Sequence, residues 1–367
     1  MRTLILTIAL LLAAPIHAEV PAEAASRLLR DALARDHGPG MMAAVARGSC
    51  LVWSDAAGHA DLEQQVPLTT DTRMRIGSVS KTLTAALALR LVQDGQMDPD
   101  ADIRDYVPAF PDKGHPITPG QLAAHVSGIR HYDFTNLMEA NNVRYYERLE
   151  DALVVFAGDD LLATPGESFE YSSFGYNLLG VAAANAAGMS FGEALAARVT
   201  MPLGLEDTLI DHPLMLIPSR TRFYTVVDGG GAINTIWRDS SDYYPSGGIL
   251  STAEDLVKFA RAVFAGDFLD AERRQLAQTR AATNDGAEVA YSFGWEVRAV
   301  NGQRRYEHGG ETNGAYARVI YLPEHDLAVA GITNYNFWGE TLGEAAFFEF
   351  IVDTLPELLA GAECARP

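Results

Sequence analysis

The period of the apolar residues changes twice along this chain, and that change most constrains its fold. Residues 41–46 and 50–54 read as two strands joined around Gly48. From there to about residue 280 the pattern is mainly helical. Strand patterns return over residues 290–300, 304–308, 315–322 and 327–333, with a hairpin turn expected at Asn301-Gly302. We therefore expect an α+β fold in which one antiparallel sheet is built from both chain ends.

Helical patterns complete this architecture. The sequence predicts a helix near each terminus, over residues 23–36 and from about Glu340 to Leu359, and these would flank the sheet. We expect a single domain over residues 19–367. Its sheet subdomain would cover about 19–75 and 285–367, and an inserted, mainly helical subdomain about 76–284. Residues 210–245 are rich in glycine and turns and are expected to run over the surface. Chemistry is expected in a cleft between sheet and helices.

The first 18 residues have the pattern of a signal peptide. Arg2 supplies the positive end, an uncharged run covers residues 4–14, and Ile16-His17-Ala18 offers a cleavage site before Glu19. The apolar run is too short to span a membrane comfortably. We expect cleavage after Ala18, a periplasmic or secreted protein, and no membrane association afterwards.

Charge and cysteine content narrow the function classes. The chain is 48% hydrophobic and 21% charged, which is typical of a globular protein. Its net charge of −20 argues against nucleic acid or anionic lipid as a partner, because both require a basic surface. Cys50 and Cys364 are the two cysteines, and an exported protein can pair them in a disulfide. Their spacing leaves that pairing open, as the sequence leaves the oligomeric state.

Ser78 and Lys81 form the most informative short motif. They stand three residues apart at the start of an apolar helix expected to reach about Gln93, so they share one helix face. Burial favours the uncharged amine, and a neutral amine can accept a serine proton. Lysine otherwise occurs only at Lys113 and Lys258. The alternative is a helix cap beside a surface lysine.

Two later stretches could join Ser78 in an acyl-transfer site. Tyr171 lies in a loop that leads into a helix, and a phenol beside an ammonium ion can act as a general base. His308-Gly309-Gly310 ends a predicted strand, where glycines allow close approach of a substrate and leave amide groups free for an oxyanion. Each stretch read alone has a plainer explanation, as a packed tyrosine and as a turn.

Other chemistries lack their motifs in this sequence. There is no Gly-x-Ser-x-Gly elbow, His-Glu-x-x-His pair, phosphate-binding loop or cysteine–histidine metal spacing. We interpret His115, His125 and His131 as structural or solvent-facing. No metal and no cofactor are expected.

Taken together in this order, the motifs resemble the β-lactamase/penicillin-binding serine hydrolases, and within them the class C-type branch. The resemblance rests on Ser78-Val79-Ser80-Lys81, Tyr171-Ser172-Ser173 and His308-Gly309-Gly310, and it runs from about residue 25 to 355. Residues 125–132 and 171–176 resemble most the mitochondrial serine β-lactamase-like proteins and their bacterial relatives. The resemblance implies a β-lactamase/transpeptidase-like fold.

The resemblance also implies roles for individual residues. Ser78 would be the acylated nucleophile, Lys81 its proton acceptor and Tyr171 a second base. The backbone amides of Ser78 and Glu311 would form the oxyanion hole, and Gly310 would keep the strand approachable. Ser173, His308 and Gly309 would contribute to substrate binding.

Two departures from the family pattern bear on the substrate. Ser173 stands where many β-lactamases have Asn, and His308 stands where they usually have Lys, so a fixed positive charge is missing at that position. We therefore expect an exported esterase or peptidase that acts on a small molecule or peptide. The alternatives are a β-lactamase or D-Ala carboxypeptidase, and a penicillin-binding sensor module without turnover.

Overall fold

The computed structural model describes residues 21–133, 135–136, 139, 141–300, 302–337 and 344–361. The α-helices are α1 (Pro21–Arg35), α2 (Ser80–Gln93), α3 (Pro119–Ala123), α5 (Ser173–Ala187), α6 (Phe191–Leu195), α7 (Met201–Leu203), α8 (Ala253–Phe264), α9 (Ala271–Gln278), α10 (Glu344–Phe348) and α11 (Leu355–Leu359). Short 3₁₀ turns are η1 (Gly77–Val79), η2 (Ile103–Asp105), η3 (Leu149–Val155) and η5 (Pro323–His325), and π-helical turns are η4 (Ala196–Thr200) and η6 (Glu349–Thr354).

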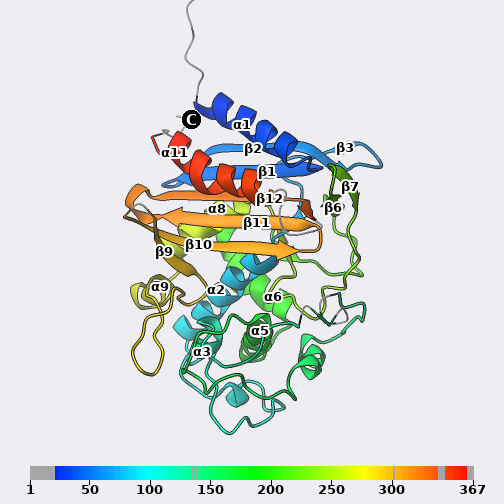
Figure 1. The fold of residues 1–367 in the computed structure, drawn as a ribbon. Coiled ribbons are helices and arrows are strands. Elements are labelled where there is room, and N and C mark those ends of the chain that lie inside the picture. Colours follow the sequence, from blue (N-terminus) through cyan, green and yellow to red (C-terminus); the bar gives the residue numbers. More distant parts are fainter. Residues whose placement is uncertain are drawn as a thin grey trace, which may run out of the picture.

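The two ends of the chain meet in one sheet. Its strands are β1 (Gly40–Arg47), β2 (Cys50–Asp61), β3 (Val66–Pro67), β9 (Glu296–Val300), β10 (Gln303–Thr312), β11 (Ala315–Leu322) and β12 (Leu327–Thr333). They run in the order β3-β2-β1-β12-β11-β10-β9, with antiparallel neighbours (Figure 1). β1 joins the two ends by pairing Met41 with Thr333 and Arg47 with Leu327. The predicted α+β architecture is therefore confirmed.

Smaller sheets flank this one. β4 (Met74–Arg75) and β5 (Leu209–Ile210) pair with β8 (Ile249–Ser251), and β6 (Tyr224–Val227) lies between β7 (Gly231–Asn234) and β13 (Tyr335–Phe337). The β4–β8 pairing brings the chain just before Ser78 against residues near 250.

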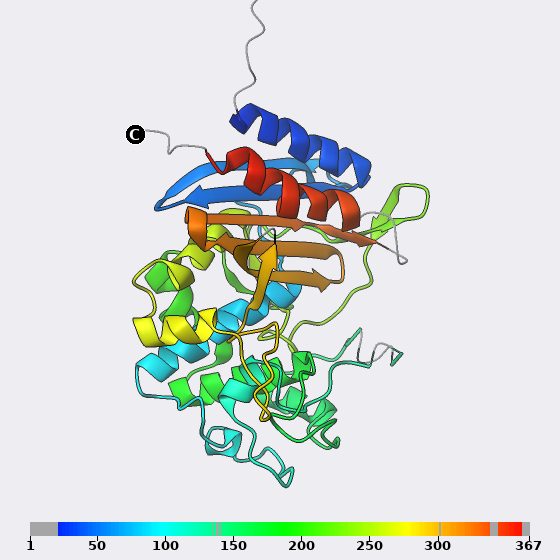
Figure 2. The ribbon, with the colours of Figure 1, turned by 60° about the vertical axis from the view of Figure 1, so that its left-hand side comes forward.

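The central strands are covered on both faces. Alternate residues of β1 enter different cores: Met42 and Ala44 pack in the core that contains α2 and α8, whereas Met41 and Val45 pack in the core that contains α1 and α11. Figure 2 shows α1 and α11 side by side over one face of the sheet. Because both faces are buried, β1 and β12 read as continuous apolar runs instead of alternating patterns.

Several elements differ from the prediction for local reasons. The strand expected from residue 290 begins only at Glu296, because Gly294 turns the chain at a φ of +95° against Ala85. Within the region expected to be mainly helical, residues 145–148 are not helical, since the Tyr146 amide donates to the Ser241 hydroxyl at 2.8 Å instead of to a helical carbonyl. β2 continues to Asp61 because its pairing with β1 extends to Gly58.

The largest difference from the prediction concerns residues 210–245, which were expected to run over the surface. Residues 239–245 are buried, and β6 and β7 form a hairpin within residues 210–245. The subdomain division stays a prediction; α8, from the middle of the chain, packs on the sheet against β1 and β12.

Several predictions involve residues outside the described ranges. They are the predicted signal peptide of residues 1–18, Cys364 as the candidate disulfide partner of Cys50, Asn301 of the expected hairpin turn, and Glu340 at the expected start of the last helix. Within the described ranges, no single helix is both long and apolar enough to cross a membrane. The bent pair Ser173–Ala187 and Phe191–Leu203, at 76° to each other, meets that criterion jointly.

Candidate active site

Ser78 lies on the 3₁₀ turn η1, which leads directly into α2. Gly77 adopts a φ of +50° there, and a Cβ on it would lie 2.7 Å from the Glu311 amide nitrogen on β10. Glycine is therefore required for both the turn and the close approach of the strand. The Ser78 side chain faces a cavity, while α2 continues from it into the core.

Lys81 is fully buried one turn further along this helix. Its Nζ lies 2.9 Å from Ser78 Oγ and donates to the Ser246 carbonyl at 2.8 Å. Burial holds the pKa of the Lys81 ammonium well below its usual value. The neutral amine thereby favoured has a lone pair for the Ser78 proton.

Tyr171 lies in the loop before α5, beside the Lys81 amine. The centre of its ring is 4.9 Å from Lys81 Nζ, and its hydroxyl lies near the Ser78 side chain. Burial, the largest influence, raises the pKa of the Tyr171 phenol. Ser78, Lys81 and Tyr171 are thus brought together, and the two pKa directions favour a neutral amine beside a protonated phenol in the resting site.

His125 packs against Tyr171. It is fully buried at a φ of +60°, and its ring centre lies 4.3 Å from that of Tyr171. His125 Nδ1 accepts the Ser172 amide at 3.0 Å, and its carbonyl accepts the Glu170 amide at 2.8 Å. Burial keeps the pKa of His125 well below its usual value. This histidine is structural and positions the Tyr171 loop.

Strand β10 approaches Ser78 from the sheet. A Cβ on Gly310 would lie 2.0 Å from the Ile76 carbonyl and 3.0 Å from the Ser78 amide nitrogen. Only glycine permits this approach. The amides of Ser78 and Glu311 consequently lie at the contact between η1 and β10, beside the Ser78 side chain.

His308 faces into the protein. Its Nε2 lies 2.8 Å from the Tyr291 hydroxyl, and its Nδ1 lies 2.6 Å from the Gly309 carbonyl. That carbonyl can only accept, so Nδ1 carries the proton and Nε2 accepts from Tyr291. Burial lowers the pKa of His308 to about 4. His308 is therefore neutral near pH 7.

The Ser78 cavity has a volume of about 330 Å³. Among the predicted site residues, Ser78, Ser173 and Glu311 line it, whereas His308, Gly309 and Gly310 are not among the residues that do. The other lining residues are His131, Tyr132, Asn141, Arg238, Tyr243, Ser246, Gly247, Thr312, Asn313 and Asn336. His131 is therefore a wall residue of this cavity, and its Nδ1 accepts the Ser173 amide at 3.2 Å.

Arg238 is the charged residue of the cavity wall that the sequence interpretation missed. It is only 7% exposed, and its guanidinium lies 4.0 Å from the centre of the Tyr243 ring and 5.3 Å from that of Tyr132. Its Nη2 lies 3.4 Å from Asp242 Oδ2. Its sequence signal is weak: a basic residue and an acidic residue four apart, in a segment without apolar period. The cavity wall thus includes a guanidinium paired with a carboxylate, from a different segment than His308.

No group of three or more histidine, cysteine or acidic side chains arranged to bind a metal occurs in the part of the chain that the structure describes.

Comparisons with known proteins show which family this chain belongs to. The Beta-lactamase family model matches residues 25–353. The human serine beta-lactamase-like protein LACTB, mitochondrial, is 27% identical over 378 residues, covering 78% of this chain and 69% of that protein. A D-aminopeptidase from Gluconobacter oxydans is 26% identical, covering 82% of this chain and 57% of its own length.

A solved structure has a similar fold. D-amino acid amidase from Ochrobactrum anthropi SV3, complexed with L-phenylalanine amide, superimposes with a TM-score of 0.78 at 26% identity, covering 92% of this chain and 98% of its own. The family match spans both the sheet and the helices around Ser78. This chain is a serine hydrolase of the β-lactamase family.

Proposed function

We propose that this protein is an exported hydrolase that cleaves an ester or amide through an acyl-enzyme on Ser78. The observation that carries the proposal is a fully buried lysine amine 2.9 Å from a serine hydroxyl at the wall of a cavity. Among the described residues, no carboxylate forms an ion pair with Lys81, and burial alone accounts for the lowered pKa of its ammonium group. A neutral lysine in this position activates a serine nucleophile.

In the acylation step, Ser78 Oγ attacks the substrate carbonyl carbon while Lys81 Nζ takes the hydroxyl proton. The amides of Ser78 and Glu311 donate to the oxygen that becomes negative. As the bond from carbon to the leaving oxygen or nitrogen breaks, the Tyr171 phenol donates its proton to that atom and regains one from Lys81. The pair returns to a neutral amine and a neutral phenol.

Deacylation reverses these roles. The Lys81–Tyr171 pair takes a proton from water, the water oxygen bonds to the acyl carbon, and the bond to Ser78 Oγ breaks with return of a proton to the serine. Tyr171 then acts as the second base, in concert with the amine. The two groups titrate as a coupled pair.

The cavity supports a substrate of modest size. Its volume of about 330 Å³ and its mixture of hydroxyl, amide and aromatic side chains suit an ester, an amino-acid amide or the end of a peptide. The D-aminopeptidase and D-amino acid amidase among the relatives favour the amide. Arg238 favours one alternative, a β-lactam or cell-wall peptide, because its guanidinium can bind a substrate carboxylate.

Export is proposed on the pattern of residues 1–18. The test is N-terminal sequencing of the protein from its native host, where a mature chain that begins at Glu19 in the periplasm or medium would support it. Retention of Met1 in the cytoplasm would contradict it.

The test of the chemistry compares wild type with Ser78→Ala. Turnover of p-nitrophenyl acetate, nitrocefin, D-phenylalanine amide and L-phenylalanine amide would be measured, with mass spectrometry of the quenched enzyme. We expect ester and amide turnover that requires Ser78, and an acyl adduct on the peptide that contains it. Faster turnover of nitrocefin would identify a β-lactamase, and an adduct without turnover a sensor. Equal rates for both proteins would refute the acyl-enzyme.

A further inference from the structure

Two asparagine side chains lie next to each other in the wall of the Ser78 cavity. Asn313 occupies the turn between β10 and β11, and Asn141 lies in the chain between α3 and η3. Asn313 Nδ2 donates to Asn141 Oδ1 at 3.0 Å and to the Ile236 carbonyl at 3.1 Å. The pair therefore joins segments from distant parts of the sequence at this cavity.

These two hydrogen bonds fix which way both amide groups face. The Ile236 carbonyl can only accept, so the nitrogen of Asn313 faces it, and the Asn141 atom that accepts from this nitrogen is the oxygen. One acceptor, Asn313 Oδ1, and one donor, Asn141 Nδ2, are left over. Within the described residues neither atom makes a hydrogen bond, and neither is among the buried polar atoms without a partner. Both atoms are therefore accessible to a ligand.

The Asn313 backbone is held in place as well. Its carbonyl accepts from Arg75 Nη1 at 3.2 Å, and Arg75 Nε donates to Asp211 Oδ2 at 2.8 Å. The Arg75 guanidinium lies 4.1 Å from the centre of the Phe223 ring. A Cβ on Gly314 would lie 2.6 Å from Phe223 Cβ, so the turn itself is closely packed. A group presented by such a fixed turn loses little entropy when it binds a ligand.

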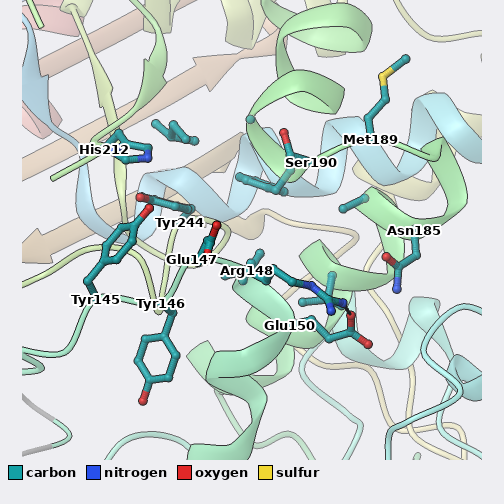
Figure 3. Close-up of a pocket in the computed structure, with 16 residues that line it drawn as sticks. Tyr145, Tyr146, Glu147, Arg148, Glu150, Asn185, Met189, Ser190, His212 and Tyr244 are labelled. Atoms are coloured by element: carbon teal, nitrogen blue, oxygen red, sulfur yellow. Dashed lines mark hydrogen bonds and ion pairs between the residues drawn. The ribbon is translucent and has the colours of Figure 1, made fainter. Parts of the chain in front are cut away.

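Another cavity, of about 380 Å³, has a different kind of wall (Figure 3). Figure 3 shows His212 and Tyr244 together at one end and Asn185 away from them. Asn185 Nδ2 donates to the Tyr106 carbonyl at 3.0 Å. None of the residues that line this cavity also lines the Ser78 cavity. Of the two cavities, the paired asparagines therefore belong only to the one at the nucleophile.

A neighbouring donor and acceptor are the complement of a peptide backbone. In an extended peptide the N–H and the C=O of one residue point to the same side, as in the hydrogen-bonded pairs of an antiparallel sheet. The N–H would donate to Asn313 Oδ1, and the C=O would accept from Asn141 Nδ2. A carboxylate can only accept and an ammonium group can only donate, so neither satisfies both asparagines.

The position of the cavity indicates which part of a substrate it receives. A compact space of about 330 Å³ is roughly 7 Å across, which is the length of about two extended residues. Ser78 lines this space, whereas Tyr171, which protonates the leaving atom in the proposed mechanism, is not among the lining residues. The acyl part of the substrate therefore lies in the cavity, with room for the reactive residue and the one before it.

We propose that Asn141 and Asn313 bind the backbone of the residue that precedes the reactive residue, and that the substrate is accordingly a peptide with at least two residues on the acyl side. Asn313 Oδ1 accepts the N–H of that residue and Asn141 Nδ2 donates to its C=O. This inference rests on the proposed acyl-enzyme at Ser78 and names its substrate class.

The test uses two achiral p-nitrophenyl esters of the same shape. N-acetylglycylglycine p-nitrophenyl ester has an N–H in the residue before the reactive one, and acetylglycolylglycine p-nitrophenyl ester has an oxygen in its place. The rates are kcat/KM after subtraction of the rate with Ser78→Ala. We expect wild type to prefer the first ester about tenfold, and Asn313→Ala to lose most of this preference because it removes the acceptor.

Asn141→Asp tests the donor. The carboxylate keeps the oxygen that accepts from Asn313 but has no amide nitrogen. Asn336→Asp is the matched control, because it adds the same charge to the wall of the same cavity and keeps the oxygen that accepts from Thr225 Oγ1 at 3.0 Å. We divide kcat/KM for the acetylglycylglycine ester by kcat/KM for p-nitrophenyl acetate. This ratio should fall about tenfold in Asn141→Asp and change less than about twofold in Asn336→Asp.

Three results would overturn the proposal: no preference in wild type, an undiminished preference in Asn313→Ala, or equal effects of the two Asp variants. Melting curves establish that each variant is folded, and the Asp variants decide the matter if Asn313→Ala does not fold. p-Nitrophenyl acetate tests the proposed function separately. An absence of Ser78-dependent turnover of this ester would overturn that function, whereas turnover without the preference would overturn only the binding of a peptide by the two asparagines.

Discussion

Substitution of Gly310 by alanine tests how the sheet and the nucleophile are joined. The added Cβ would lie 2.0 Å from the Ile76 carbonyl oxygen and 3.0 Å from the Ser78 amide nitrogen. Non-bonded contacts of carbon settle near about 3.5 Å, so β10 and η1 must separate by more than about 1 Å. The obstacle is backbone on both sides, and it cannot rotate away.

The expected loss follows from that displacement. Moving the Glu311 amide by about 1 Å removes one donor from the developing oxyanion, and such a loss lowers kcat about 10²–10³-fold, or roughly 3–4 kcal/mol. Gly309→Ala is the matched control. Its Cβ would point to the other face of β10, 2.8 Å from Arg318 Nη1, which is the end of a flexible side chain. We expect its loss to be at least about tenfold smaller.

The assay is kcat for p-nitrophenyl acetate on both variants, with circular dichroism melting curves to establish that each is folded. A folded Gly310→Ala enzyme with kcat close to that of wild type would refute the proposed oxyanion hole. Equal losses in the two variants would show that general disturbance of β10, and not the approach to Ser78, accounts for the effect.

Three further predictions concern single groups. Because burial lowers the pKa of Lys81, kcat/KM for p-nitrophenyl acetate should rise as the pH increases through that lowered pKa, where the amine loses its proton, and then level off at a pH well below the usual lysine pKa. Lys81→Arg should lower kcat/KM at least about 10³-fold. An active Arg variant with the same pH profile would exclude Lys81 as the base. The double variant Arg238→Gln/Asp242→Asn removes a buried ion pair without leaving one charge alone. It should raise KM for an ester substrate that carries a free carboxylate about tenfold more than KM for the same substrate with that carboxylate methylated. Equal changes in the two KM values would rule out binding of the carboxylate by Arg238. His125→Ala leaves the Ser172 amide without its acceptor and opens a cavity, so the free energy of unfolding in urea should fall by about 2–4 kcal/mol. The fall should be smaller in His125→Asn, because asparagine tolerates the positive φ at this position. An unchanged stability would contradict the supporting role of this histidine.

The sequence determined the parts of this protein that depend on local pattern. Alternation and apolar runs are properties of short windows, so the strands of both chain ends and the helix after Ser78 were predictable. The three-residue spacing of Ser78 and Lys81 fixes their proximity on any helical turn. The order of the motifs along the sequence, which resembles that of the family, then linked Ser78 and Lys81 to Tyr171. The structure brings Tyr171 close to Ser78.

Tertiary structure alone decided the environment of these groups. The low pKa of the Lys81 ammonium arises from burial, and the carbonyl that orients the amine lies 165 residues away, just after the segment expected on the surface. Arg238 lines the cavity from that expected surface segment and is paired with Asp242. A pattern of residue types carries no record of which distant segment covers it, because burial and charge are set by packing between segments that no local period relates.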